Sequence, residues 1–388
     1  MFDPERLIHK RAHQIDASGI RRVFDLAAQL DDPINLSIGE PHFDVPEPVK
    51  EAAIEAIRTG DNHYTVTQGK VELRRKIAAH LSDDLPNWQS GLESGELETM
   101  VSSGVSGGLV LALLACVGPG HEVLISDPYF VMYHHLVRLV GATPVCVNTY
   151  PDFQFTPERI EPLISPRSRM IIFNSPANPT GAVAGDSTCR AVAQLASKHG
   201  LLLLSDEVYD EFCYEKIPRN GKMRCPSPAA HSSELLLLRG FSKTYSMTGW
   251  RMGYAAGPRP IIEQMNKLQQ YSFVCAPSMV QRAGLVAMDL DLGRYLDEYR
   301  QKRDRVVERL EKVFGLIRPG GAFYAFPQLP EGLGLDATRF VERAVERGVL
   351  VIPGSVFSRR DTHFRLSYAC EDQTLEKGLD ILVELAGG

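Results

Sequence analysis

Between residues 100 and 260, short runs of aliphatic residues recur at intervals long enough to hold a helix. The runs are EVLIS near 122, PVCVN near 144, MIIF near 170, LLLLS near 201 and LLLL near 235. A strand with one solvent-exposed face alternates apolar and polar residues. These runs are continuously apolar, so both faces of each strand are expected to be buried. The pattern predicts an α/β fold with a mostly parallel open sheet covered by helices.

The composition narrows the class of protein. With 388 residues, 44% of them apolar, the chain has enough material for a large core. A net charge of -6 without long runs of one sign argues against nucleic acid or an anionic membrane as a partner. The first residues lack the apolar stretch of a secretory signal, and no later segment could span a bilayer, so we expect a soluble, cytoplasmic protein. The cysteines and histidines have no metal-ligand spacing, so reduced thiols and no metal are expected.

The two ends of the chain differ from the middle. Residues 1–45 hold a short helical segment over 20–30 followed by an extended one, and residues 281–388 hold long charged helices with strands near 322–326 and 363–367. We predict a large domain over 46–280 and a smaller α/β domain formed by 1–45 together with 281–388.

Three segments with reactive side chains follow the aliphatic runs directly. They are Asn178-Pro-Thr-Gly181, Asp206-Glu-Val-Tyr209 and Ser242-Lys243. In open α/β sheets ligands bind beyond the carboxyl ends of the strands, so these segments are expected at one site.

Lys243 gains significance from its neighbours. A lysine after a strand is usually a solvated surface charge, but Ser242 and Arg251 could reach one anion together, and burial beside cations lowers the pKa of an amine. The glycine-rich residues 101–108 precede an apolar helix expected over 109–117, and their N–H groups could cradle a phosphate. The alternative is a helix start with small residues for close packing against the sheet.

Asp206 and Arg365 each allow two interpretations. Asp206 follows an apolar run, so it could cap a helix beginning at Glu207 or pair with a protonated pyridine nitrogen, which is the better account. Tyr209 would then donate to the phenolic oxygen of the same ring rather than only pack in the core. Arg365 lies in the alternating segment HFRLSY, where a buried charge needs an anionic ligand. The alternative is an arginine on an exposed strand face.

Six motifs in register span nearly the whole chain and closely resemble the class I pyridoxal-phosphate aminotransferases of fold type I. They are Gly39-Glu-Pro-His-Phe-Asp-Val-Pro46, Tyr64 in HYTVTQG, Asn178-Pro-Thr-Gly181, Asp206-Glu-Val-Tyr209, Ser242-Lys243 with Arg251, and Arg365-Leu-Ser-Tyr-Ala369. Bacterial and archaeal aspartate or aromatic aminotransferases look most similar.

The resemblance implies a role for each matching residue. Lys243 would bind pyridoxal phosphate covalently and move the substrate proton. The other implied contacts are Asp206 with the pyridine nitrogen, Asn178 and Tyr209 with the phenolic oxygen, Phe130 stacked on the ring, Val105, Ser106, Ser242 and Arg251 with the phosphate, and Arg365 with Gly39, Asn178 and Phe130 around the substrate. Tyr64 would reach the phosphate of a neighbouring subunit, which implies a homodimer with shared active sites.

The implied reaction moves the amino group of an L-amino acid to a 2-oxo acid such as 2-oxoglutarate by a ping-pong mechanism. Some aspartate-specific relatives carry a lysine where this chain has Ser106, and residues 271–277 contain no basic side chain. Of the aspartate, aromatic or broad donor specificity that the resemblance implies, these departures disfavour a preference for aspartate, and aromatic, alanine-type and broad specificity remain open. A carbon-sulfur β-lyase, which uses the same cofactor constellation without an acceptor, is the alternative. The absence of a GxGxxG fingerprint disfavours a nicotinamide oxidoreductase, and a cofactor-sensing regulator would usually carry a DNA-binding module.

Overall fold

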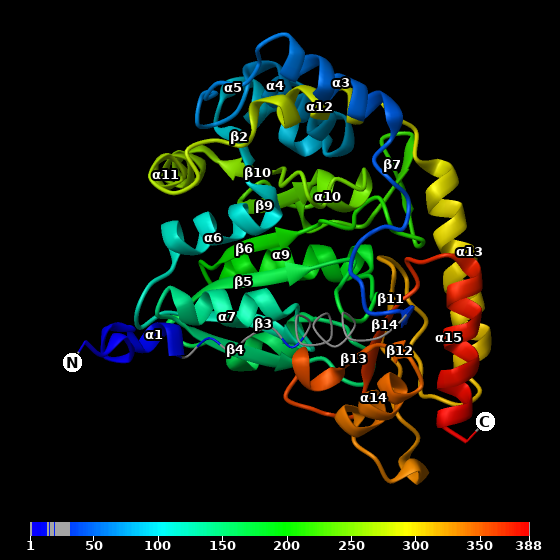
Figure 1. Ribbon diagram of the computed structural model, residues 1–388. Helices are drawn as coiled ribbons and strands as arrows, with labels where there is room; N and C mark the ends of the chain where they lie inside the picture. Colours follow the sequence, from blue (N-terminus) through cyan, green and yellow to red (C-terminus); the bar gives the residue numbers. More distant parts are fainter. Residues whose placement is uncertain (1, 14, 16–18, 20–31, 388) are drawn as a thin grey trace.

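The computed structural model describes residues 2–387 except 14, 16–18 and 20–31. Its centre is a seven-stranded sheet, in which every neighbouring pair is parallel except the two pairs that contain β10. In spatial order the strands are β2 (Leu97–Ser102), β10 (Gly253–Pro258), β9 (Leu235–Gly240), β6 (Leu202–Asp206), β5 (Ser168–Asn174), β3 (Glu122–Asp127) and β4 (Thr143–Asn148). The α/β prediction is confirmed (Figure 1), and the short helix expected over 20–30 lies outside the described residues.

All five aliphatic runs form strands of this sheet. Both faces are buried in β3, β5, β6 and β9, but the expectation is wrong for β4, which lies at the sheet edge, is mostly half-buried, and has Thr143 and Asn148 exposed. In β5, Met170 and Ile172 pack into one hydrophobic cluster, while Ile171 and Phe173 pack into the cluster on the other side. This explains why the runs lack polar alternation.

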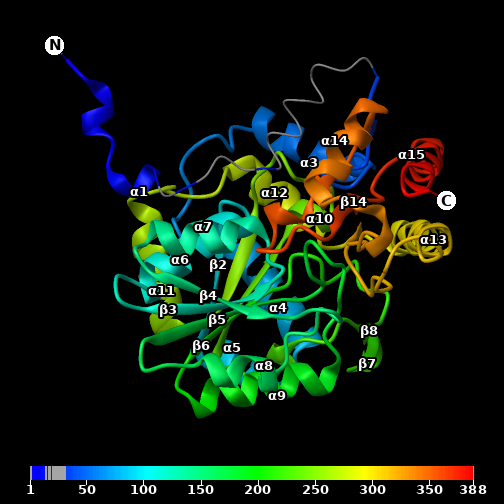
Figure 2. The ribbon, with the colours of Figure 1, turned by 90° about the horizontal axis from the view of Figure 1, so that it is seen from below.

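Helices cover both faces of the sheet (Figure 2). The cluster around Met170 is closed by α6 (Gly104–Cys116), α7 (Val131–Leu139) and α11 (Arg259–Gln270). The helices on the opposite side are α3 (Glu47–Arg58), α4 (Val71–Asp84), α5 (Gln89–Ser94), α8 (Pro157–Ile160), α9 (Asp186–Lys198) and α12 (Ser278–Ala287). Within the described chain, every helix is too short or too polar to cross a bilayer.

The helix expected over 109–117 begins earlier than predicted. It starts at Gly104, so the glycine-rich segment forms its first turns instead of preceding them. A Cβ atom on Gly108 would lie 3.2 Å from Leu238 Cδ2, so glycine allows this turn to pack closely on β9. Close packing explains why a run of poor helix formers is helical here.

The C-terminal elements lie beside the sheet, and all of them except β13 contribute side chains to a separate hydrophobic cluster. They are α13 (Gly293–Leu310), β11 (Tyr324–Ala325), α14 (Ala337–Glu346), β12 (Val349–Leu350), β13 (Ile352–Pro353), β14 (Phe364–Ser367) and α15 (Asp372–Leu385). The early strand β1 (Ile34–Asn35) pairs with β12 in parallel. By contrast, α1 (Lys10–His13) contacts α7 of the sheet layer. The domain boundaries at 46 and 280 stay a prediction.

A buried ion cluster lies beneath the carboxyl ends of β6 and β9. Arg239 of β9 is 3% exposed, and its guanidinium donates to Asp84 Oδ2 at 2.7 Å and to Glu207 Oε2 at 2.8 Å. Burial alone would raise the pKa of Asp84, but the charges of Arg239 and Arg219 hold that pKa well below its usual value. Because Glu207 follows Asp206 directly, the cluster anchors the strand end that carries a predicted site residue.

Substituting Arg239 should destabilise the fold strongly. Arg239→Leu removes the guanidinium that Asp84, Glu207 and Asp210 share. Asp84 keeps Arg219, but Glu207 and Asp210 lose their cation, and we expect the free energy of unfolding to fall by about 3–5 kcal/mol. Arg190→Leu is the matched control, because Arg190 is exposed and lies 3.6 Å from Asp186, and it should cost less than about 1 kcal/mol. Urea unfolding followed by circular dichroism measures both, and equal losses would contradict a special role for the cluster.

Candidate active site

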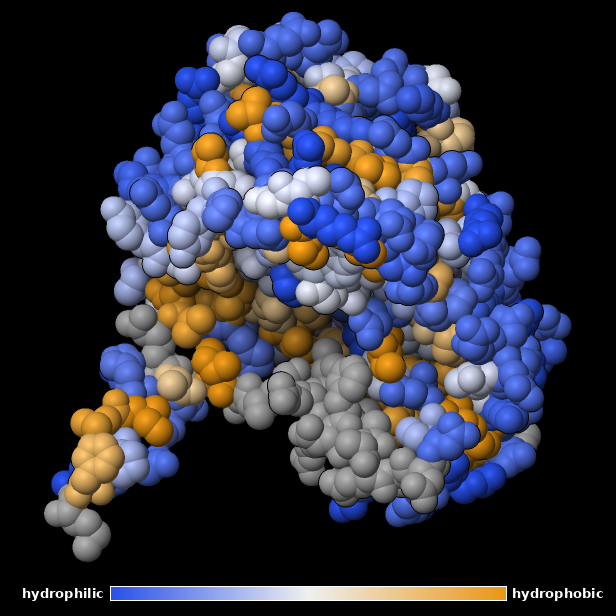
Figure 3. Space-filling view, turned by 45° about the horizontal axis from the view of Figure 1, so that its top comes forward, coloured by the Kyte–Doolittle hydropathy of each residue, from blue (hydrophilic) through white to orange (hydrophobic). Residues whose placement is uncertain are grey.

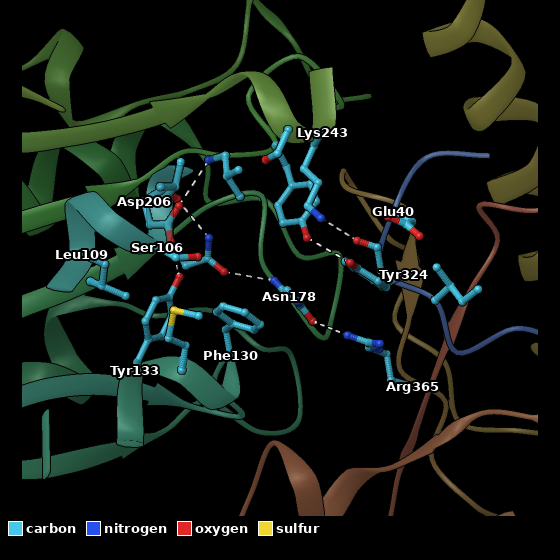
Figure 4. A pocket seen from close by; sticks show the side chains of 18 of the residues that line it. Glu40, Ser106, Leu109, Phe130, Tyr133, Asn178, Asp206, Lys243, Tyr324 and Arg365 are labelled. Carbon is cyan, nitrogen blue, oxygen red and sulfur yellow. Dashed lines mark hydrogen bonds between the residues drawn. The ribbon is translucent and has the colours of Figure 1, made fainter. Parts of the chain in front are cut away.

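A cavity of about 330 Å³ lies at the carboxyl ends of β5, β6 and β9. Every site residue predicted from the sequence lines it except Tyr64. Its walls are Ile38, Gly39, Glu40, Val105, Ser106, Leu109, Phe130, Met132, Tyr133, Asn174, Asn178, Asp206, Val208, Tyr209, Ser242, Lys243, Arg251, Tyr324 and Arg365. Figure 4 shows Lys243, Asp206, Asn178 and Arg365 converging on it from separate elements.

Lys243 lies on the short helix α10 (Phe241–Thr244), which follows β9 without a loop. Its Nζ atom donates to the carbonyl oxygen of Gly39 at 2.6 Å. Burial is the main cause that lowers the pKa of Lys243 to about 8, and the charges of Arg365 and Arg251 add to it against the opposing charge of Glu40. The amine is therefore no solvated surface charge, and it loses its proton more readily than an ordinary lysine does.

Arg251 and the first turn of α6 form a cationic end of the cavity. Gly104 has φ +69°, and a Cβ atom there would lie 2.7 Å from Arg251 Nη2, so glycine lets the guanidinium approach the helix start. The first N–H groups of a helix have no acceptor within it, and they attract anions. Arg251 itself is left-handed, with φ 55°. A left-handed backbone conformation costs free energy in any residue other than glycine. Such strain is often found where a side chain must be held in a fixed position for function, which here would be anion binding.

Asp206 ends β6 and is 4% exposed. No helix begins at Glu207, so the capping interpretation is wrong: the chain turns there instead. Tyr133 Oη donates to Asp206 Oδ2 at 2.6 Å, and the backbone N–H of Val208 donates to Oδ1 at 3.3 Å. Burial raises the pKa of Asp206 to about 6, although both hydrogen bonds favour the ionised carboxylate.

Asn178 connects two parts of the cavity. Its backbone N–H donates to Asn174 Oδ1 at 3.0 Å, and its side-chain oxygen accepts from Arg365 Nη1 at 3.1 Å. Asn174 Nδ2 in turn donates to the carbonyl oxygen of Asp206 at 2.9 Å. The loop after β5 is thus fixed to the end of β6.

Arg365 lies in β14 and is 1% exposed, so the interpretation as an exposed surface arginine is wrong. Its Nη2 atom donates to the carbonyl oxygen of Ser37 at 2.7 Å, while Nε has no hydrogen-bond partner. The rings of Tyr324 and Phe357 lie 4.5 and 4.8 Å from its guanidinium carbon. No carboxylate of the described chain forms an ion pair with it, and burial lowers its pKa. A buried guanidinium without a carboxylate partner is preorganised to bind an anion.

Four polar residues that line the cavity were not predicted: Glu40, Tyr133, Asn174 and Tyr324. Glu40 lies in the motif over 39–46, and Asn174 directly follows the aliphatic run MIIF, so the sequence pattern could have identified both residues. Tyr324 approaches Tyr209, their hydroxyl oxygens being 2.9 Å apart, although 115 residues separate them in the sequence. Tyr64 lies outside the cavity on the loop between α3 and α4, and it is 86% exposed.

The residues present fit pyridoxal phosphate. The cationic end suits a phosphate, a buried amine faces the same cavity, and Asp206 offers a carboxylate to a ring nitrogen. In the described part of the chain, no group of three or more His, Cys, Asp or Glu side chains could hold a metal ion.

Comparison with known proteins agrees with this chemistry. Residues 31–382 match the family described as aminotransferase class I and II. The chain is 35% identical to a probable aspartate aminotransferase of Methanocaldococcus jannaschii, over 98% of this chain and 100% of that protein. It is 34% identical to aromatic-amino-acid aminotransferase 2 of Thermococcus litoralis, over 95% of this chain and 96% of the relative.

Solved structures give the same result. The aspartate aminotransferase of Thermus thermophilus with maleate superposes with a TM-score of 0.87 at 34% identity, covering 97% of this chain and 99% of that one. The aromatic aminotransferase from Pyrococcus horikoshii has a TM-score of 0.83 at 34% identity, covering 93% and 98%. This chain therefore belongs to the class I pyridoxal-phosphate-dependent aminotransferases and transfers amino groups with that cofactor.

Proposed function

We propose that the enzyme transfers the amino group of an L-amino acid to a 2-oxo acid such as 2-oxoglutarate, with its chemistry centred on Lys243. The observation that carries this proposal is that one cavity contains both Lys243, an amine with a lowered pKa, and Arg365, a buried guanidinium. Every amino acid and every 2-oxo acid carries a carboxylate beside the reacting carbon, so both substrates of a ping-pong reaction can use the same clamp.

The lining residues have separate tasks in this proposal. Bound pyridoxal phosphate supplies the electron sink for the bond broken at the substrate α-carbon. Lys243 would accept the proton from the substrate α-carbon and deliver it to the aldehyde carbon of the cofactor, and its pKa near 8 suits both steps. Arg365 holds the substrate carboxylate together with Asn178 and the backbone of Gly39.

The cofactor contacts complete the proposal. Asp206 pairs with the pyridine nitrogen, Asn178 and Tyr209 contact the phenolic oxygen, and Phe130 stacks on the ring. Val105, Ser106, Ser242 and Arg251 bind the phosphate. Support comes from their placement around one cavity and from the anion-attracting start of α6.

We also propose that the cavity lies between two domains, over 46–280 and over 1–45 with 281–388. Asp206 comes from the central sheet and Lys243 from the helix α10 that follows β9, whereas Gly39 and Arg365 come from the segments before and after the sheet. Separate hydrophobic clusters support this division. Closure of such domains around a substrate would exclude water from the cavity.

A homodimer is proposed from the surface around Tyr64. Tyr64 and Val66 are exposed, as are Tyr271 and Phe273, and Gln269 Nε2 donates to the carbonyl oxygen of Thr67 at 2.6 Å, which joins the two loops. Apolar side chains also gather around a hollow in the face shown in Figure 3. Exposed apolar surface of this kind favours association, and Tyr64 would reach the partner's phosphate. The seven free thiols suit a reducing compartment such as the cytoplasm.

The side-chain pocket favours broad specificity with apolar or aromatic donors preferred. Relatives are named for aspartate, for aromatic amino acids and for aspartate with prephenate. The basic side chains that line the cavity within the described chain, Lys243, Arg251 and Arg365, all have tasks already. Ile38, Leu109 and Met132 are apolar walls.

A donor screen with 2-oxoglutarate tests the proposed function. We expect glutamate to form from aromatic donors at a higher kcat/KM than from aspartate, because no basic wall residue among the described residues remains for a second carboxylate. The measurement is coupled detection of glutamate for each donor in turn. If no donor yields glutamate while a cysteine conjugate releases ammonia without an acceptor, a β-lyase is the correct function.

Removing the Arg365 guanidinium should weaken the binding of every amino donor and every 2-oxo-acid acceptor. Arg365→Ala loses charge-assisted hydrogen bonds worth about 2–4 kcal/mol, so kcat/KM should fall roughly 30- to 1,000-fold, mostly through KM. Steady-state kinetics with two donors measures this effect. Arg360→Ala is the control, because Arg360 stacks on Tyr150 outside the cavity. An unchanged KM in Arg365→Ala would place the carboxylate site elsewhere.

A further inference from the structure

The Asp206 carboxylate depends on one side-chain hydrogen bond. Tyr133 Oη donates to Oδ2 at 2.6 Å, and the only other hydrogen bond to this carboxylate from the described residues is the longer one from the Val208 N–H to Oδ1 at 3.3 Å. No lysine, arginine or histidine of the described residues forms an ion pair with Asp206. The adjacent carboxylate, Glu207, is paired with Arg239 instead. Asp206 is therefore buried with a neutral partner, where a charge is costly unless it is hydrogen-bonded.

Tyr133 is suited to act as a permanent donor. Its side chain is 2% exposed, and burial together with the charge of Asp206 keeps the pKa of its hydroxyl well above the ordinary value. The hydroxyl thus retains its proton and orients it toward Oδ2. Oδ1, which accepts only a 3.3 Å contact, keeps free capacity for another donor.

The same turn of chain supplies the predicted stacking ring. Phe130 is the N-cap residue of α7, and Tyr133 lies in the first turn of that helix. Their ring centroids are 5.6 Å apart in an edge-to-face arrangement, next to Asp206 (Figure 4). Any shift of Tyr133 would therefore move both the ring that covers the cofactor and the partner of Asp206.

We propose that Tyr133 is a positioning residue that holds the Asp206 carboxylate ionised and aimed with Oδ1 toward the pyridine nitrogen of the cofactor. The inference rests on the proposed function, because Asp206 must face that nitrogen. Tyr133 acts through Asp206 and does not itself contact the substrate. Its hydroxyl should therefore matter for cofactor affinity only while residue 206 is a carboxylate.

A double-mutant cycle on pyridoxal phosphate binding tests this. The apoprotein is titrated with pyridoxal phosphate, and the dissociation constant is read from tryptophan fluorescence for the wild type, Tyr133→Phe, Asp206→Asn and the double variant. Phenylalanine fills the same space, so the fold is kept. We expect Tyr133→Phe to weaken binding about five- to twentyfold in the wild type, but less than twofold in the Asp206→Asn background. Tyr129→Phe is the control, since the buried Tyr129 ring stacks on His134, and it should change the constant less than twofold.

The pH dependence of binding supplies a second reading. The hydrogen bond from Tyr133 favours the ionised carboxylate, so its loss raises the pKa of Asp206. The midpoint at which acidification weakens cofactor binding should then move to higher pH in Tyr133→Phe. Equal losses of affinity in both backgrounds, or no loss and no shift of the midpoint, would overturn the inference. If the wild type itself fails to bind pyridoxal phosphate, the proposed function fails instead.

Discussion

The structure depends on keeping charged side chains buried in one cavity without pairing them to each other. Arg365 is 1% exposed and retains an unbonded Nε, Asp206 has only a neutral side-chain partner, and the pKa of Lys243 is lowered to about 8 by burial. Each of these arrangements is costly without a further partner. A carboxylate, a ring nitrogen and an aldehyde would supply such partners, which is why we propose that these three side chains bind substrate and pyridoxal phosphate.

The central sheet holds the side chains of one wall of the cavity in place. The strands that present Asn174, Asp206 and Lys243 are buried on both faces, and a cluster centred on Arg239 fixes the ends of β6 and β9 from below. The cavity therefore has one wall of fixed geometry. Its other wall, with Gly39 and Arg365, comes from segments outside this sheet, which is the arrangement that the proposed two-domain division requires.

The sequence predicts features that depend on neighbouring residues, and it does not predict contacts between residues far apart in the chain. β3, β5, β6 and β9 were predictable because burial on both faces leaves an unbroken aliphatic run, whereas β10 (Gly253–Pro258) is built from small residues and carries no such signal. Lys243, Asp206 and Asn178 were predictable because they follow strands directly. Tyr133 and Tyr324 were not, since their partners lie 73 and 115 residues away and only the fold brings them together.

Covalent trapping tests the central claim that Lys243 is the reacting amine. Holoenzyme reconstituted with pyridoxal phosphate is reduced with borohydride, digested and analysed by peptide mass spectrometry. We predict a single pyridoxyl modification, on the peptide that contains Lys243, and its loss in Lys243→Ala although that variant still binds the cofactor. Modification of another lysine in the wild type, or amino transfer retained by Lys243→Ala, would contradict the account.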